Sequence, residues 1–246
     1  MPLHPDLAGR KALVTGGSRG IGRAIASLLA EAGADVAINY ASRKTEADAA
    51  ASAIARSGRR TLAIAADVSD GAAVAQMFGR LASEFGGIDI LVNNAGIALH
   101  RGIDDLTEAD FDRTIAVNLK SAFLCTQAAL PHMRAQGWGR IVNISSGAAR
   151  GAGGIGLHYN ASKAGLEGLT RGYAARLVKE GITVNAVAPS LIETDMLRGG
   201  LASGISRIPL GRFGTADEVA AVVLMLIGNA YMTGQTVALS GGMTFN

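Results

Sequence analysis

A tyrosine and a lysine stand four residues apart in the stretch HYNASKAG, which covers residues 158–165. On a helix, positions four apart lie on one face, one turn apart, so Tyr159 and Lys163 are expected to point the same way. An ammonium group beside a phenol favours the phenolate and lowers the phenol pKa. The pair is typical of a tyrosine that donates a proton near neutral pH. The alternative is a surface pair on an amphipathic helix, and other features of the chain must decide.

A second candidate site is the glycine-rich stretch TGGSRGIG, residues 15–22. Gly16, Gly20 and Gly22 lie between an expected strand and an expected helix. Missing side chains let the backbone approach a pyrophosphate, and a helix N-terminus supplies free N–H groups and the positive end of the helix dipole. The alternative is a tight turn that only packs the helix against the strand. The strand–glycine–helix order favours the phosphate site.

Short apolar strands alternate with longer helical stretches along the whole chain. The strands are expected at 11–15, 35–40, 61–67, 88–96, 139–146, 182–189 and 235–242. The helices are expected at 20–33, 44–58, 71–86, 107–135, 159–179 and 215–228. Strands that are apolar throughout indicate burial on both faces, hence a parallel sheet. The sequence therefore predicts an α/β fold, a single doubly wound Rossmann domain over residues 1–246 with seven parallel strands and helices on both faces.

Polar and glycine-rich residues follow several of these strands. Asp67 ends the third strand, the residues NNAG (93–96) end the fourth, Ser145 and Ser146 the fifth, and Pro189 the sixth. Ligands of such sheets bind at the carboxyl ends of the strands, near the switch in strand order. The sequence thus predicts that these residues share one site with the glycine-rich turn.

Composition excludes several other classes of function. The net charge is +3, and basic stretches such as 56–60 have no interleaved aromatic residues, so a nucleic-acid partner is not expected. The apolar run 219–227 is too short to cross a bilayer, and no secretion signal is visible at the N-terminus. Cys125 is the only cysteine, which favours a reducing cytoplasm. The histidines show no metal-ligand pattern, so no metal is expected.

The chain resembles the classical short-chain dehydrogenases/reductases over nearly its whole length, and most of all their 3-oxoacyl-[acyl carrier protein] reductase branch. The motifs that carry this resemblance are TGGSRGIG, NNAG, the VNL around Asn118, NISS, YNASK, NAVAP with IET, and MTGQTVALSGGM. Their order and spacing together make the resemblance specific. One departure is Ser190, where the family usually has glycine after this proline.

The resemblance implies a role for each matching residue. Tyr159 would be the general acid for ketone reduction, Ser146 would bind the substrate oxygen, Lys163 would bind the nicotinamide ribose and lower the tyrosine pKa, and Asn118 would hold a water in the proton relay. Ser145 or Ser146 could be only a strand-end cap, and the thirteen-residue spacing from Ser146 to Tyr159 favours Ser146. Asn118 alone would read as an ordinary polar helix residue. The cofactor-binding residues expected are Gly16, Ser18, Arg19, Gly20, Ile21, Gly22, Ser42, Arg43, Asp67, Val68, Asn94, Ala95, Gly96, Tyr159, Lys163, Pro189, Ile192 and Thr194.

The end of the second strand predicts NADP(H) rather than NAD(H). An NAD site typically places a carboxylate there for the ribose hydroxyls, but this end reads NYASRK, with no acid before Glu46. Arg19 and Arg43, aided by Ser42, are suited to a 2′-phosphate. The alternative is a pair of solvated surface arginines.

A 3-oxoacyl thioester is the substrate that the resemblance implies, with a smaller ketone, sugar or secondary alcohol as the second choice. A sensor that binds NADP without turnover is less favoured, because the three catalytic side chains are all present. The acyl carrier protein is acidic, and five basic residues are candidates for contacting it, unless they are only solvated: Arg134, Arg140, Arg171, Arg176 and Lys179. Residues 197–212 are expected to form a lid. Small residues such as Ala161, Ala164, Gly165 and Gly168, together with the resemblance, predict a homotetramer.

Overall fold

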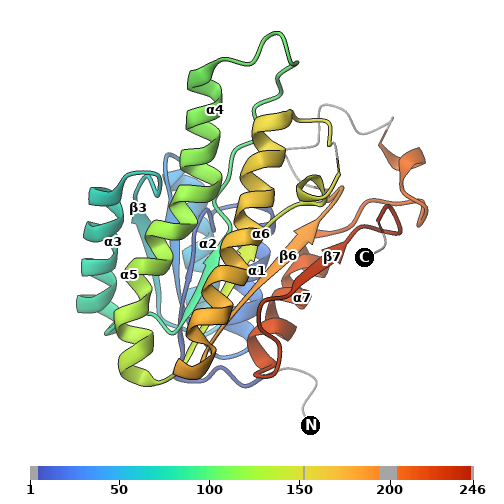
Figure 1. Cartoon of the computed structure of the whole chain (residues 1–246). Coiled ribbons are helices and arrows are strands. Elements are labelled where there is room, and N and C mark those ends of the chain that lie inside the picture. Colours follow the sequence, from blue (N-terminus) through green and yellow to red (C-terminus); the bar gives the residue numbers. More distant parts are fainter. Residues whose placement is uncertain (1–4, 152, 194–203, 245–246) are drawn as a thin grey trace.

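The computed structural model describes residues 5–151, 153–193 and 204–244. Seven parallel strands form one sheet in the order β3-β2-β1-β4-β5-β6-β7 (Figure 1). The strands are β1 (Lys11–Val14), β2 (Asp35–Tyr40), β3 (Thr61–Ala65), β4 (Ile90–Asn93), β5 (Gly139–Ile144), β6 (Ile182–Pro189) and β7 (Thr236–Leu239). The predicted fold class is confirmed, and each predicted strand is present. The bounds predicted for β2 and β6 are confirmed, and the other five strands were predicted too long because polar, glycine or other residues beyond the ladder belong to loops.

Helices cover both faces of the sheet. They are α1 (Gly20–Glu31), α2 (Lys44–Arg56), α3 (Gly71–Phe85), α4 (Glu108–Ile115), α5 (Ser121–Gln136), α6 (Leu157–Leu177) and α7 (Ala216–Gly228). Helices α1, α2 and α7 share one apolar core with the sheet, and α3, α5 and α6 share the other. Figure 1 shows α5 and α6 side by side in front of the sheet. Burial on both faces explains why the strands read as apolar throughout.

The helix expected at 107–135 is continuous but changes its winding in the middle. Helix α4 passes into a π-helical segment, η1 (Ala116–Lys120), and this passes into α5. The residues at both junctions keep right-handed helical angles. A π-helical turn shifts the following side chains around the axis and is frequent at functional sites. Asn118 lies in this segment.

The chain reverses its direction of winding between β1 and β4, which are neighbours in the sheet although β2 and β3 lie between them in sequence. The loops after β1 and β4 therefore diverge at this point and leave a crevice at the carboxyl ends. This is where the glycine-rich turn and residues 94–96 meet.

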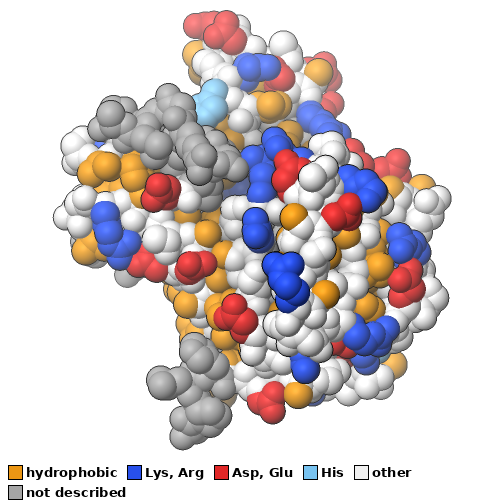
Figure 2. All heavy atoms as spheres, turned by 180° about the vertical axis from the view of Figure 1, so that it is seen from behind, with side chains coloured by type: hydrophobic (Ala, Val, Ile, Leu, Met, Phe, Trp, Pro, Cys, Tyr) orange, Lys and Arg blue, Asp and Glu red, His pale blue; other side chains and the backbone are white. Residues whose placement is uncertain are grey.

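The surface over α1, α2 and α7 mixes acidic, basic and apolar side chains (Figure 2). Two of its ion pairs lie on α2, Arg43 with Glu46 and Lys44 with Asp48. Within the described part of the chain, no helix is long and apolar enough to span a membrane. No group of acidic, histidine or cysteine side chains suited to a metal ion occurs among those same residues.

Candidate active site

The glycine-rich turn leaves no room for side chains. Gly16 and Gly20 have φ angles of +62° and +52°, which favour glycine. A Cβ atom on Gly22 would lie 2.4 Å from the Gly16 carbonyl oxygen and 2.5 Å from the Asn94 side-chain nitrogen. Helix α1 begins at Gly20, so its free N–H groups face the space above β1. The turn can accept a phosphate group on its backbone, as the spacing predicted.

Three polar side chains hold this turn, and sequence reasoning named only one of them. Asn94 donates from its side chain to the carbonyls of Thr15 (2.9 Å) and Gly16 (3.1 Å). The Thr15 hydroxyl accepts the backbone N–H groups of Asn94 and Ala95 at 2.9 and 3.0 Å. Asn39 on β2 accepts the Gly16 N–H at 3.3 Å. The signal for Thr15 and Asn39 was a polar residue within or at the end of an otherwise apolar strand.

Ser146 lies close enough to Tyr159 to oppose the rise in the tyrosine pKa that burial causes. Ser146 follows β5 and also caps a short 3₁₀ turn by accepting the Ala148 N–H at 3.2 Å. The neighbouring Ser145 points elsewhere, since its hydroxyl lies 3.2 Å from the Glu167 carboxylate and the residue is 4% exposed. The choice of Ser146 over Ser145 thus agrees with the geometry.

Lys163 lies one turn after Tyr159 on α6, and its Nζ is 5.7 Å from the centre of the tyrosine ring. The shared face predicted from the spacing is confirmed. The predicted lowering of the tyrosine pKa is wrong for this structure, because burial raises the pKa of Tyr159 and the Ser146 hydrogen bond opposes that only in part. Burial also lowers the pKa of Lys163 to about 8, so the side chain is still mostly an ammonium group near pH 7. Its ammonium group donates to the Ile144 carbonyl at 2.8 Å.

Asn118 is buried and points to the loop after β4. Its side chain accepts the Ile97 N–H at 2.8 Å, and donates to the Ile97 carbonyl at 3.0 Å and to the Ser162 hydroxyl at 3.2 Å. A Cβ atom on Gly96 would lie 3.3 Å from the Asn118 oxygen and 3.6 Å from the Lys163 nitrogen. Gly96, Asn118 and Lys163 therefore line one space. Ser162, which sequence reasoning missed, carries no motif signal beyond its place inside YNASK.

The basic residues expected at the end of β2 already have a partner. Arg43 lies 3.0 Å from the Glu46 carboxylate, and both side chains are about half exposed (50% and 44%). Hydrogen bonding to its own backbone N–H and to Arg43 lowers the pKa of Glu46, and Arg19 is close enough to add to this lowering. Ser42 is exposed beside them. Arg19 and Arg43 therefore both lie near Glu46, beside the glycine turn.

The remaining predicted cofactor residues fall into two groups. Asp67 lies at the carboxyl edge, where it accepts from Ser69 and pairs with Arg113 at 3.4 Å, and the Ser69 hydrogen bond is the main cause of its lowered pKa. Ser18, Val68, Pro189 and Ile192 are buried, and Val68 and Ile192 pack in the two cores. Any contact of these two with a cofactor would have to come from the backbone. Thr194 and residues 197–203 of the expected lid lie outside the described residues.

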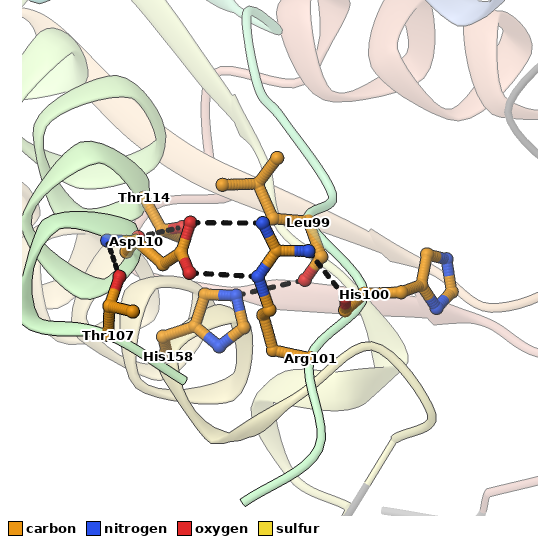
Figure 3. A network of polar contacts seen from close by, with 7 residues as sticks. All are labelled: Leu99, His100, Arg101, Thr107, Asp110, Thr114 and His158. Carbon is orange, nitrogen blue, oxygen red and sulfur yellow. Dashed lines mark hydrogen bonds and ion pairs between the residues drawn. The ribbon is translucent and has the colours of Figure 1, made fainter. Parts of the chain in front are cut away.

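His158 connects α6, the helix of Tyr159, to the loop after β4. Its Nε2 lies 2.9 Å from the Leu99 carbonyl, and the side chain is fully buried. The same loop is also held at Arg101, two residues after Leu99. The Arg101 guanidinium donates two hydrogen bonds to the Asp110 carboxylate of α4, at 2.8 and 3.3 Å (Figure 3). The histidine therefore joins the start of α6 to the loop beside the candidate site.

Two further expectations are wrong in this structure. Arg140 cannot contact a partner protein, because it is 6% exposed and its guanidinium donates to the carbonyls of Ile227, Gly139 and Gly181. Gly165 is not on an outer face of α6, because a Cβ there would lie 2.8 Å from Leu119 within the chain.

Ser190 fits its position without backbone strain, since no described non-glycine residue has a positive φ. Its hydroxyl lies 2.5 Å from where a Cβ on Gly147 would be, directly beside Ser146. The serine therefore adds a polar group next to the candidate catalytic pair.

A protein-family model described as Enoyl-(Acyl carrier protein) reductase matches residues 16–244. The chain is 44% identical over 242 residues to the 3-oxoacyl-[acyl-carrier-protein] reductase FabG of Staphylococcus aureus, covering 95% of this chain and 98% of that protein. It is 42% identical over 239 residues to the (2S)-[(R)-hydroxy(phenyl)methyl]succinyl-CoA dehydrogenase subunit BbsD of Thauera aromatica, covering 95% and 96%. A short chain dehydrogenase from Burkholderia cenocepacia, solved in complex with NADP, superposes with a TM-score of 0.90 at 44% identity over 97% and 99% of the two chains. The chain belongs to the short-chain dehydrogenase/reductase family.

Proposed function

We propose that this protein is an NADPH-dependent carbonyl reductase, and that it reduces 3-oxoacyl thioesters to their 3-hydroxyacyl forms. The observation that carries the proposal is the proximity of Ser146 to Tyr159, which lies one turn from the buried Lys163 at the edge of the sheet that also holds the glycine turn. Two neighbouring hydroxyl donors suit a carbonyl oxygen on which negative charge grows.

Each residue then has a task in the reduction. Ser146 donates a hydrogen bond to the ketone oxygen and holds it, and Tyr159 donates the proton that turns this oxygen into a hydroxyl. The raised pKa of Tyr159 keeps its proton in place until the oxygen becomes basic. Asn118 fixes the loop at Ile97, and Lys163 lies beside Gly96, where a ribose would lie. Bound NADPH supplies the hydride for this chemistry.

The residues present fit a dinucleotide phosphate. The backbone of the glycine turn is open to a pyrophosphate because Gly16, Gly20 and Gly22 carry no side chains there. Arg19 and Arg43 lie where a 2′-phosphate would replace the Glu46 carboxylate as the partner of the guanidinium groups. The Burkholderia cenocepacia relative, solved with NADP, supports the same choice of cofactor.

The proposed substrate rests on the FabG relatives, which are named as 3-oxoacyl-[acyl-carrier-protein] reductases. An acidic carrier protein would require an accessible basic surface. Arg171 and Arg176 lie about 18 and 25 Å along α6 from Tyr159, at a rise of about 1.5 Å per residue. Arg134 is paired with Glu180 at 2.6 Å. A carrier protein docked on these residues would therefore lie far from the catalytic site of the same chain. The proposal accordingly rests on the thioester group of the substrate and not on a contact with the carrier protein.

The second candidate is a dehydrogenase of a different secondary alcohol or ketone. The relative named as a succinyl-CoA dehydrogenase subunit supports it, because that protein acts on a hydroxyl group in a CoA thioester. Ser190 supports it too, since its hydroxyl lies next to Ser146 and suits a polar substrate.

The test of the proposed function compares substrates and then removes the proton donor. We expect kcat/KM with NADPH to be higher for a 3-oxoacyl carrier-protein thioester and its CoA analogue than for simple ketones or an enoyl thioester.

Tyr159→Phe keeps the ring but loses the transferable proton, so turnover should fall by about a thousandfold or more while the Kd for NADPH changes by less than about twofold. Substantial turnover in that variant contradicts the mechanism, and a preference for simple ketones contradicts the substrate. A carrier advantage that does not shrink as salt rises argues against a charge-guided carrier contact.

We further propose a cytoplasmic homotetramer. The single cysteine is free and buried, which is compatible with a reducing compartment. Exposed apolar side chains on the outer helices, such as Phe123 on α5 at 44% exposure, support burial against other copies of the chain.

A further inference from the structure

His158 lies next to Tyr159 in the first turn of α6, and it is 0% exposed. Its Nε2 lies 2.9 Å from the carbonyl oxygen of Leu99. A carbonyl oxygen can only accept, so Nε2 carries the ring proton and Nδ1 is left as an acceptor. Among the described residues, this Nδ1 is a buried atom with no hydrogen-bond partner. The ring is therefore committed to a single polar contact.

That contact fixes the middle of the loop 97–101. The loop is bound on one side at Ile97 by the Asn118 side chain, at 2.8 and 3.0 Å. It is bound on the other side at Arg101, whose N–H donates to the Ile155 carbonyl at 3.0 Å. Figure 3 shows the His158 ring directed at Leu99, which lies between Ile97 and Arg101 in the sequence. Without the histidine, the only hydrogen bond at the centre of the loop among the described residues is the one from the Arg101 guanidinium to the His100 carbonyl, at 3.1 Å.

The same loop lies along the catalytic residues. At its start, Gly96 is in contact range of Asn118 and Lys163. At its end, Arg101 is joined to the segment 153–156, which leads directly into His158 and Tyr159. A Cβ on Gly156 would lie 2.6 Å from the His158 ring and 3.0 Å from the Arg101 carbonyl, so the loop, the ring and this segment are closely packed. The loop therefore forms a wall beside the space in front of Tyr159.

Stability alone does not explain a histidine at this position. A buried acceptor without a donor is unfavourable, and an apolar side chain of similar volume would avoid it. Residues that cost stability in this way are found where function requires them. The bond to Leu99 is the single polar contact of this ring, so that bond is what an apolar replacement would lose.

We propose that His158 is a positioning residue, which holds the loop 97–101 through the Leu99 carbonyl and so sets the substrate pocket against Tyr159. This inference rests on the proposed function, in that the pocket takes a ketone. The ion pair of Arg101 with Asp110 holds the far end of the same wall from α4. Substrate binding, rather than the proton transfer, is the step that this arrangement controls.

Kinetics of three variants test the proposal. His158→Met removes the donor and the unpartnered acceptor and keeps a comparable volume. His158→Gln keeps an amide N–H for Leu99. His100→Met is the matched control, because His100 is exposed on the same loop and Figure 3 shows its ring pointing away from this network. We expect KM for the ketone to rise about tenfold in His158→Met, with kcat changed less than about threefold and the Kd for NADPH unchanged. The glutamine variant should recover most of the KM, and the His100 control should match the wild type.

A second measurement does not depend on activity. Amide hydrogen exchange of residues 99–102, followed by mass spectrometry, should be faster in His158→Met than in the wild type and close to normal in His158→Gln. The thermal midpoint of His158→Met should be equal to or above that of the wild type. A wild-type KM together with wild-type exchange in the methionine variant overturns the proposal. A lower midpoint that parallels the loss of activity also overturns it, because His158 would then be structural.

The proposed function fails on a separate observation, namely wild-type protein that oxidises no NADPH with any ketone. In that case the exchange measurement still decides whether His158 holds the loop.

Discussion

Lys163 is a basic side chain in a position that disfavours its charge. It is 4% exposed, and burial lowers its pKa from 10.5 to about 8. Only the Ile144 carbonyl accepts a bond from its ammonium group among the contacts that the structure describes. A ribose hydroxyl would supply a further acceptor, so binding of the cofactor and protonation of Lys163 should support each other.

The lowered pKa of Lys163 predicts how stability changes with pH. Between pH 8 and pH 10.5 the unfolded chain holds a proton that the folded chain has lost, so this residue makes stability rise with pH in that window. Below pH 8 the folded and the unfolded chain both hold this proton, so the folded state carries the full cost of burying the charged side chain. Lys163→Met should therefore be more stable than the wild type at pH 7, and the difference should close towards pH 10.5. Urea unfolding at several pH values measures it, and a difference that is independent of pH contradicts the assignment.

Glu46 is predicted to compete with the 2′-phosphate of NADPH for Arg43. The carboxylate lies 3.0 Å from the Arg43 guanidinium and near Arg19, so a phosphate must displace it. Since exposed ion pairs are weak, Glu46→Gln should tighten NADPH binding by at most about fivefold and leave NADH binding unchanged. Arg43→Ala should weaken NADPH binding.

Asp48→Asn is the control for Glu46→Gln, because Asp48 pairs with Lys44 on the same helix at 2.6 Å. It should change the affinity for NADPH far less. Fluorescence titration at low and high salt measures all of these variants. If the two acid-to-amide variants behave alike, general surface charge explains the result and Glu46 has no specific role.

At the scale of the elements, the site depends on how β1, α1 and the loop after β4 fit together. Gly22 allows the first turn of α1 to pass the Gly16 carbonyl and the Asn94 amide. Asn118 reaches the same loop from the π-helical segment between α4 and α5. The geometry of the site is thus set by a missing Cβ and by a local change in helix winding.

Gly22→Ala should disrupt the glycine turn. Its Cβ would lie 2.4 Å from a backbone oxygen, which cannot move without shifting the turn. We expect a lower thermal midpoint and a loss of NADPH affinity of at least about tenfold. Gly79→Ala is the matched control, since Gly79 lies in α3 with nothing within 4 Å of an added Cβ, and alanine there should stabilise by up to about 1 kcal/mol. Calorimetry with and without NADPH distinguishes the two, and normal cofactor affinity in Gly22→Ala contradicts the tight approach.

At the scale of the whole molecule, the outer face of α6 offers a surface for another copy of the chain. Ala161, Ala164 and Gly168 are exposed on it, and a Cβ on Gly168 would meet only the end of Arg171 at 4.0 Å. Small residues allow two helices to approach closely across a symmetric boundary.

Gly168→Leu should therefore leave the fold of one chain intact and dissociate the proposed tetramer. The added side chain meets open space within the chain, but it would fill the contact with a second α6. Light scattering measures the mass and far-UV circular dichroism measures the helix content. A wild-type monomer at micromolar concentration contradicts the tetramer, and a tetrameric Gly168→Leu variant contradicts this face as its interface.

The sequence by itself determined the order and type of the elements. Apolar strands, glycine punctuation and helical spacing are local signals, since they report how each segment is buried and where the chain turns. The expected position of Ser146 beside the glycine turn followed from the rule that parallel strands end together. The expected roles of Tyr159 and Lys163 followed from their helical spacing and from the family resemblance.

The tertiary structure alone decided which side chains meet across distant segments. Arg140 becomes a buried donor to three carbonyls, Gly165 packs on Leu119, and His158 reaches Leu99, although none of these contacts leaves a periodic trace in the sequence. The direction in which the pKa of Tyr159 shifts is likewise decided by the tertiary structure. The spacing placed a lysine beside it, but desolvation depends on everything packed around both groups, and here it outweighs the charge. Burial is a property of the whole fold, and a single stretch of sequence does not contain it.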